Sequence, residues 1–360
     1  MDGHEGPVTC LALSSDGENL LSGSEDGSAR LWKLSDWKCA SLLAGHKEAV
    51  LCVALSPDGK KAATGSKDQT IWVWDLETKE CLAVLSGHER MVNGLAFASD
   101  GSRLASGSKD GTVKVWEVEK GQCLYSFNGG AGAVNGILMH PEKPWILAGT
   151  EGNMVFLLDF STQEVLKRFF RKDWKVSAIE VDQEWRRMIC GARDGSLSIW
   201  DLTASEVSYS VEGHQEEIKS LCTGHRKSVS ASKDKTIKVW DLTTGKCART
   251  FVGHEAPVYG VAISEDGKKI ASSSDGGVVC LWNAGRGECI HALKQHRGIV
   301  SHVFFHSGDR KIVSVGFHDN TIRVWDMLSG ECLQVLSGHE RWIEQIDRKS
   351  TRLNSSHVSQ

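Results

Sequence analysis

Four sets of histidine, serine and aspartate recur in this chain with a composition that could support acyl-transfer chemistry. A serine whose proton is taken by a histidine, itself oriented by an aspartate, is the nucleophile of many hydrolases. In each set a tryptophan follows six residues after the aspartate. The sets are His4, Ser24, Asp26 and Trp32; His46, Ser66, Asp68 and Trp74; His88, Ser108, Asp110 and Trp116; and His214, Ser232, Asp234 and Trp240.

The repetition of these sets argues against catalysis. A Gly-x-Ser-x-Gly nucleophile elbow is missing around all four serines. A site copied several times along one chain is usually part of the architecture. We therefore predict that the protein is not an enzyme and has no catalytic residue, cofactor or small-molecule substrate. The polar groups of each set would instead satisfy one another, because each unpaired buried group costs about 1–3 kcal/mol.

The histidines belong to a longer repeat with a period near 42 residues. Seven of nine anchor positions hold histidine, and a tryptophan or its replacement follows each of the first eight about 28 residues later. Such a period means that each unit buries its apolar face only by stacking on its neighbours. The anchors are His4, His46, His88, Gly130, Lys172, His214, His254, His296 and His339.

The second unit shows that one repeat encodes four strands. Apolar, β-prone runs cover residues 50–55, 61–65, 70–74 and 80–85, and turn signals such as Ser56-Pro57-Asp58-Gly59 separate them. Sheets of this kind, repeated radially, form a β-propeller. We predict an all-β propeller with eight blades of four antiparallel strands. A seven-bladed ring followed by the start of a second propeller is the alternative.

The repeat resembles the WD-repeat family. The resemblance rests on the Gly-His anchors, the period and the Trp-Asp pairs that close the third strand, and it covers residues 3–346. It implies a rigid platform that binds other proteins or peptides. It also implies a network in which the aspartate holds the anchor histidine and the serine links that histidine to the indole N–H. The Trp-Asp pairs are Trp74-Asp75, Trp200-Asp201, Trp240-Asp241 and Trp325-Asp326.

The resemblance further implies a partner-binding face formed by residues beside the first strand's start and before the turn aspartate. Met, Tyr, Trp and Arg among them are enriched at interfaces, and four cations favour a partner with acidic groups. Lysines that only keep the surface soluble are the alternative. The face would comprise Leu51, Lys67, Met91, Asn93, Lys109, Lys175, Arg193, Lys219, Lys233, Tyr259, Ile299, His318 and Trp342.

Several units depart from the pattern. Unit four has Gly130, Gly152 and Leu158 in place of histidine, aspartate and tryptophan, and unit five has Lys172 as its anchor. We expect blades four and five to be the least rigid. Unit seven has Gly276 instead of aspartate, and unit eight has Phe317 instead of serine.

Units four and five also share a basic, aromatic segment over residues 167–175. This composition could bind an acidic peptide or a nucleic-acid backbone. The alternative that we favour is an outer strand with Phe169 facing the sheet and solvated cations, so nucleic acid is not the expected partner.

Composition indicates a folded protein of the cytoplasm or nucleus. The net charge is −4 and 40% of residues are hydrophobic. No apolar run is long enough to span a membrane. Six of the eleven cysteines occupy one repeated slot, which indicates reduced thiols, and there is no Cys-x-x-Cys zinc motif. His302 and His306 lie in a strand pattern, so no metal site is predicted.

The last 14 residues, 347–360, abandon the repeat and resemble the translation of a sequencing-library adapter. We therefore predict a propeller over residues 1–346 and a tail that is not native. Three functions stay open: a scaffold or adaptor, the sensor propeller of a larger truncated signalling protein, and an assembly factor in ribosome biogenesis. The last rests on the likeness of residues 126–150 to a degenerate unit in a WD-repeat protein linked to ribosomes.

Overall fold

The computed structural model describes residues 4, 6, 8–36, 38–171, 175–204, 207–224, 226–306, 308, 310–316, 319, 321–337, 347–348 and 356–357. The described residues contain strands and no helix. The chain divides into two compact units, one of Met1–Lys175 with Gln345–Gln360 and one of Val176–Glu344. Within the described part, strands β1 to β32 form eight antiparallel sheets of four consecutive strands each.

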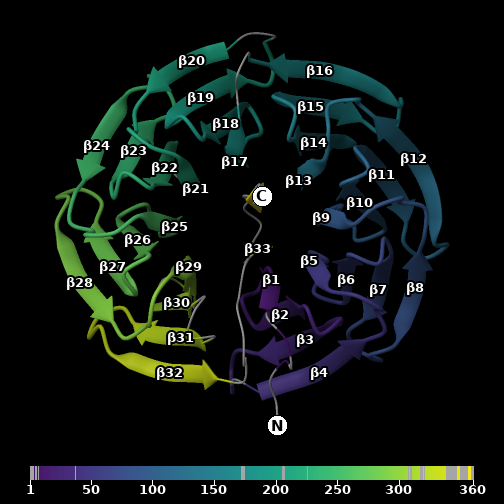
Figure 1. The fold of residues 1–360 in the computed structure, drawn as a ribbon, viewed down its shortest axis with the longest axis horizontal. Coiled ribbons are helices and arrows are strands. Elements are labelled where there is room, and N and C mark those ends of the chain that lie inside the picture. Colours follow the sequence, from purple (N-terminus) through teal and green to yellow (C-terminus); the bar gives the residue numbers. More distant parts are fainter. Residues whose placement is uncertain are drawn as a thin grey trace. The chain divides into compact units, whose positions relative to one another are not determined.

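The first unit holds blades one to four (Figure 1). In each blade the strands pair in chain order, and β33 adds to β1 in parallel. The strands are β1 (Val8–Leu13), β2 (Asn19–Ser24), β3 (Ser28–Lys33), β4 (Lys38–Ala44), β5 (Val50–Leu55), β6 (Lys61–Ser66), β7 (Ile71–Asp75), β8 (Cys81–Leu85), β9 (Val92–Phe97), β10 (Arg103–Ser108), β11 (Thr112–Glu117), β12 (Gln122–Asn128), β13 (Val134–Met139), β14 (Trp145–Thr150), β15 (Met154–Asp159), β16 (Glu164–Phe170), β33 (Asp347–Arg348) and β34 (Ser356–His357).

The second unit holds blades five to eight, built in the same way. The prediction of an all-β propeller fold with eight four-stranded blades is confirmed. The strands are β17 (Val176–Val181), β18 (Arg187–Ala192), β19 (Ser196–Asp201), β20 (Val207–Glu212), β21 (Ile218–Gly224), β22 (Lys227–Ser232), β23 (Ile237–Asp241), β24 (Cys247–Phe251), β25 (Val258–Ile263), β26 (Lys269–Ser274), β27 (Val278–Asn283), β28 (Cys289–Lys294), β29 (Val300–His306), β30 (Lys311–Gly316), β31 (Thr321–Asp326) and β32 (Cys332–Ser337).

The hydrophobic core lies between neighbouring blades rather than inside one sheet. One cluster combines Ile71 and Val73 of blade two with Val92, Leu95 and Trp116 of blade three. Equivalent clusters join blades one and two, three and four, five and six, six and seven, and seven and eight. A single repeat therefore cannot bury its apolar side chains alone, which is why the sequence needs successive copies.

A glycine in the second strand lets two blades approach closely. A Cβ atom at Gly65 would come within 2.9 Å of a Val92 methyl group in the next blade. Real side chains do not tolerate that distance, so a substitution would push the two sheets apart.

The fourth strand of every blade carries a bulge beside the closing tryptophan, or beside Leu158 in blade four. In blade three, Val115 pairs with Tyr125 and Trp116 pairs with Cys123, so Leu124 has no opposite residue on the third strand. The same register shift occurs in all eight blades. The fourth strand is also the edge of its sheet.

No helix in the described chain is long and apolar enough to cross a membrane.

Candidate functional site

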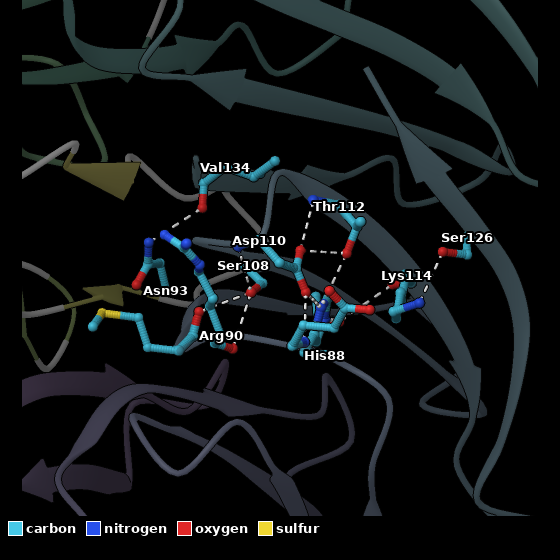
Figure 2. A network of polar contacts seen from close by, with 12 residues as sticks. His88, Arg90, Asn93, Ser108, Asp110, Thr112, Lys114, Ser126 and Val134 are labelled. Carbon is cyan, nitrogen blue, oxygen red and sulfur yellow. Dashed lines mark hydrogen bonds and ion pairs between the residues drawn. The ribbon is translucent and has the colours of Figure 1, made fainter. Parts of the chain in front are cut away.

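The anchor histidine of blade three lies at the centre of a buried polar network. The Nδ1 atom of His88 is 2.9 Å from Oδ2 of Asp110, and its Nε2 atom is 2.7 Å from Oγ of Ser106. The indole N–H of Trp116 donates to the same Ser106 hydroxyl over 2.8 Å. Figure 2 shows the histidine beneath the carboxylate and the turn that carries it.

The direction of each hydrogen bond in this network can be assigned. An indole nitrogen only donates, so Ser106 accepts from Trp116 and directs its own proton toward Nε2 of His88. Nδ1 therefore carries the ring proton and donates to Asp110. The hydroxyl of Thr112 donates to the other carboxylate oxygen over 2.6 Å. A neutral histidine thus satisfies every group of the network.

We call this set of histidine, linking hydroxyl, aspartate and tryptophan the blade staple. Complete staples also occur in blades one, two, six and eight. Their histidine–aspartate distances are 2.9, 2.9, 2.8 and 2.9 Å. Blade seven keeps the histidine, hydroxyl and tryptophan. The linking hydroxyls belong to Ser22, Thr64, Ser106, Ser230, Ser272 and Ser314.

The serines predicted to link histidine to tryptophan are the wrong residues. Ser66 donates to the carbonyls of Glu48 and Ala49, and it accepts the N–H of Asp68. Ser66 is the last residue of β6, so its hydroxyl meets the anchor loop, whereas Thr64 lies beside the histidine and the indole. The correction also applies to Ser24, Ser108 and Ser232, which bond the backbone around their turns.

The sequence contained a signal for the linking residue. A serine or threonine stands four residues before the turn aspartate in blades one, two, three and six. Blade eight has one extra residue between Ser314 and Asp319. Phe317, predicted to replace the serine of that blade, lies outside the described residues, and the strand residue two after Ser314 is Gly316.

Burial and hydrogen bonding fix the charge states of the staple. Burial lowers the pKa of His4, His46, His88 and His214, and the paired aspartate offsets this only in part. Burial by itself would raise the pKa of Asp68. Hydrogen bonds from the Thr70 hydroxyl, from backbone N–H groups and from His46 outweigh that effect and lower the pKa to about 2. Neutral histidine and ionised aspartate therefore coexist at neutral pH.

The staple has the connectivity of a catalytic triad without its access. Ser106, His88 and Asp110 are joined in the order of a nucleophile, a base and an orienting carboxylate. However, the Ser106 side chain is fully buried, and its oxygen already accepts a hydrogen bond from Trp116. A catalytic nucleophile must come within hydrogen-bond reach of its substrate, and a hydroxyl with no exposed surface cannot be reached. The arrangement therefore serves to hold strands together.

The predicted partner-binding residues surround these staples. Lys67, Lys109 and Lys175 are exposed; Leu51, Met91, Asn93, Arg193, Lys219, Lys233, Tyr259 and Ile299 are half-buried; His318 and Trp342 lie outside the described residues. We call the described members of this set the anchor-loop face.

Three of the anchor-loop cations converge on one acidic residue that the sequence reasoning missed. Glu217 precedes β21 and pairs with Arg193, Lys219 and Lys233. Lys67 lies beside a different carboxylate, Glu48, at 3.7 Å. No pattern of the repeat marks Glu217, because the equivalent positions of neighbouring blades hold other residue types.

The family model for the WD domain, G-beta repeat (WD40) matches residues 1–33, 37–75, 79–117, 121–159, 205–241, 245–283 and 287–326. The chain belongs to the WD40 family. Its WD40 architecture also resembles that of the computationally designed Ika8 protein, with a TM-score of 0.77 and 26% sequence identity. That match covers 91% of this chain and 98% of the Ika8 chain.

Curated relatives match this WD40 chain over shorter stretches. The p21-activated protein kinase-interacting protein 1-like of Gallus gallus is 34% identical over 17% of this chain and 16% of its own length. The non-functional target of rapamycin complex subunit LST8-2 of Arabidopsis thaliana is 27% identical over 51% of this chain and 61% of its own length. This chain therefore spans less than two thirds of either relative.

Blades seven and four of this WD40 chain have a glycine in place of the staple aspartate. In blade seven His254 bonds Ser272 at 2.6 Å, and Gly276 leaves its Nδ1 atom without a carboxylate. Burial lowers the pKa of His254 to about 4. In blade four Gly152 packs so tightly that a Cβ atom would lie 2.0 Å from the carbonyl oxygen of Ala131.

The basic, aromatic segment forms the outer strand of WD40 blade four. Phe169 on β16 is 1% exposed and packs inward, whereas Phe170 is 56% exposed. The two phenylalanines therefore alternate on this outer strand as expected. Arg168 is exposed on the same strand, whereas Lys167 is half-buried. Residues 172–174 lie outside the described chain.

No metal site is found in the described part of the chain. Groups of three or more histidine, cysteine, aspartate or glutamate side chains that could hold an ion are absent there. His302 and His306 both lie on β29, as the strand pattern predicted. All eleven cysteines are free thiols.

Proposed function

We propose that this WD40 chain is a non-catalytic scaffold or adaptor that binds other proteins or peptides through its anchor-loop face. One observation carries the proposal. In each complete staple, the histidine, aspartate and linking hydroxyl are hydrogen-bonded to one another. The loop residues beside them present cations and apolar groups that take no part in a staple. A rigid frame with variable exposed side chains is suited to recognition rather than to bond-making.

The names of two relatives support a role in protein complexes. One relative is named as like an interacting protein of a p21-activated kinase, and the other as a non-functional subunit of a target of rapamycin complex. We propose acidic groups on the partner, because Lys67, Lys109, Arg193 and Lys233 each occupy the position before a turn aspartate. Free thiols favour the cytoplasm or nucleus as the working compartment.

Charge reversal on the anchor-loop face tests the proposal. Lys67, Lys109 and Lys233 are changed together to glutamate, and proteins that crosslink to the purified chain in a cell extract are compared with those of the wild type. The matched control reverses Lys60, Lys246 and Lys268, which are exposed on turns at the opposite ends of the strands. We expect loss of the principal crosslinks only in the first variant. Crosslinks that survive in it would refute the proposed face.

A further inference from the structure

Three cations and one carboxylate form a compact cluster in the second unit. Oε2 of Glu217 lies 2.8 Å from Nζ of Lys233 and 3.1 Å from Nζ of Lys219, and Oε1 lies 3.9 Å from Nε of Arg193. Arg193 follows β18 of blade five. In blade six, Glu217 precedes β21, Lys219 lies on β21 and Lys233 follows β22. Two neighbouring blades therefore supply one site.

The cluster is partly withdrawn from water. The side chain of Glu217 is 15% exposed, and those of Lys219, Arg193 and Lys233 are 26%, 31% and 38% exposed. The ammonium group of Lys219 also lies 5.8 Å from the ring centroid of Tyr259 in blade seven. These contacts fix the directions of the cations, because a half-buried carboxylate and an aromatic ring both restrict their rotamers.

The charges within the cluster do not balance. Three formal positive charges face one carboxylate, so these four side chains together carry a net charge of +2. Burial alone would raise the pKa of Glu217, but the contacts with Lys233 and Lys219 outweigh burial and lower it, so the carboxylate is ionised at neutral pH. Glu217 offsets only part of the repulsion among three half-buried cations, so an external anion would be attracted to them. The site is thus complementary to a ligand that carries about two negative charges.

We propose that the cluster of Arg193, Lys219 and Lys233, organised by Glu217, binds the phosphate of a phosphorylated side chain on a partner protein. This inference rests on the proposed function and names the chemistry of its partner. A phosphomonoester carries about −1.5 to −2 charges and three acceptor oxygens, which match three donors and a net charge of two. A carboxylate supplies only one charge.

A further carboxylate acts on the tyrosine ring that borders the cluster. Burial and then the charge of Asp275 raise the pKa of Tyr259. The first unit offers matched residues without this convergence, since Lys67 and Lys109 occupy the same turn position as Lys233. Lys67 there faces a single exposed glutamate, Glu48.

Immobilised peptide libraries with degenerate flanks test the proposal on the full chain. Their central residue is fixed as phosphoserine, glutamate or serine. We expect enrichment from the phosphoserine library alone. Selected phosphopeptides should bind at least about tenfold more weakly to the Lys219→Gln/Lys233→Gln variant, which loses two charge-assisted donors. The Lys246→Gln/Lys268→Gln control, on exposed turns at the opposite ends of the strands, should change binding less than about twofold.

Several outcomes would overturn the phosphate assignment. Equal enrichment of the glutamate library would mean that the site binds any negative charge and does not distinguish a phosphate from a carboxylate. Displacement of the phosphopeptide by a short single-stranded RNA at equal concentration would assign a nucleic acid instead. Equal weakening by the Lys246→Gln/Lys268→Gln control would place the site elsewhere. If the Lys67, Lys109 and Lys233 reversal removes crosslinks while no phosphopeptide binds, the scaffold function stands and only the phosphate inference fails.

Matched melting temperatures show that the variants fold. The substituted lysines are partly exposed, so we expect each double variant to unfold like the wild type. A Glu217→Gln variant gives an independent measurement. Loss of the internal carboxylate removes the contact that orients the three cations, and we expect the preference for the phosphoserine library over the glutamate library to fall. An unchanged preference would show that Glu217 does not organise the site.

Discussion

One hydroxyl group in each stapled blade bonds two aromatic residues at once. Ser106 joins Trp116 to His88, whereas Ser108 bonds only the backbone near its turn. The triad-like spacing in the sequence pointed to the histidines and aspartates but to the wrong serine. Spacing alone does not reveal which of two hydroxyls on one strand lies beside the ring and which lies beside the loop.

Replacement of the linking hydroxyl should expose its role. We expect Ser106→Ala to lower the free energy of unfolding by about 1–3 kcal/mol, because the indole N–H and Nε2 of His88 both lose their partner. The indole N–H resonance of Trp116 should shift in this variant. Ser108→Ala is the matched comparison, and an equal indole shift there would contradict the assignment of the two serines.

The isolated His254 makes blade seven sensitive to acid. Its pKa of about 4 lies below the ordinary value of 6.5. Unfolded chains therefore bind a proton at this site before the folded protein does, and stability falls as pH drops from about 6.5 to 4. The full loss from this group is about 3 kcal/mol. A carboxylate at position 276 would raise the pKa of His254 and reduce the loss.

Gly276→Asp should therefore protect the protein at low pH. A Cβ atom at this position meets no atom nearer than 3.6 Å. We expect the free energy of unfolding, measured with urea, to fall less between pH 7.5 and pH 5 in this variant than in the wild type. Gly276→Asn has the same shape without the charge, so an identical pH response would exclude the carboxylate as the cause. Gly152→Asp should instead destabilise the fold at both pH values, because of the Ala131 carbonyl.

At the scale of the element, the staple couples an anchor loop to the turn of its own blade. The backbone N–H after the histidine donates to the aspartate in blades two, three, six and eight. Blade four has Gly152 in place of that acceptor. Its core is instead apolar, with Ala148 and Leu158 at the hydroxyl and tryptophan positions. The two kinds of blade thus hold their loops by different means.

Hydrogen exchange should distinguish the two kinds of blade. We expect amides in the anchor loops of blades four and five to exchange faster than those of blades one to three, since they lack a complete staple. Mass spectrometry of the native protein after timed labelling measures the difference. The amides of Lys47 and Glu89, which donate to staple aspartates, serve as internal references. Faster exchange in blades one to three would contradict the prediction.

The strand positions of the second blade could be predicted closely from the sequence. The expected second-blade strands at residues 50–55, 61–65, 70–74 and 80–85 agree with β5 to β8 to within one residue at each end. The alternation of apolar and polar residues and the turn residues are local features, so they can be recognised in one sequence without knowledge of the tertiary structure. The Glu217 cluster is not local. Its members come from two blades, and the pairing of Arg193 with Glu217 depends on how those blades pack.

At the scale of the whole molecule, the outer strands carry the exposed cysteines. Cys81, Cys123, Cys247 and Cys289 are exposed, and each opens or nearly opens the fourth strand of its blade. Cys10, Cys52, Cys190 and Cys280 are buried in the inner three strands. Burial raises the pKa of Cys190 far above its ordinary value, which suppresses the thiolate there.

Thiol labelling should follow this division. In the native protein we expect iodoacetamide to modify the four exposed cysteines first and the four buried ones only after unfolding. All eleven should react in denaturant without a reductant, since every cysteine is a free thiol. Peptide mapping by mass spectrometry identifies the sites. Native labelling of Cys190 as fast as that of Cys123 would contradict the burial pattern.

The bulge beside each closing tryptophan has a consequence for crowded solutions. A straight outer strand would offer evenly spaced N–H and C=O groups on which a second copy could add its own strand, and copies could then polymerise edge to edge. The residue at the bulge, such as Leu124 in β12, breaks that spacing near the start of the strand. Any added strand would lose its register after a few residues. Repetition multiplies sheet edges, and we expect the bulge that is repeated with them to hinder copies from joining edge to edge into fibres.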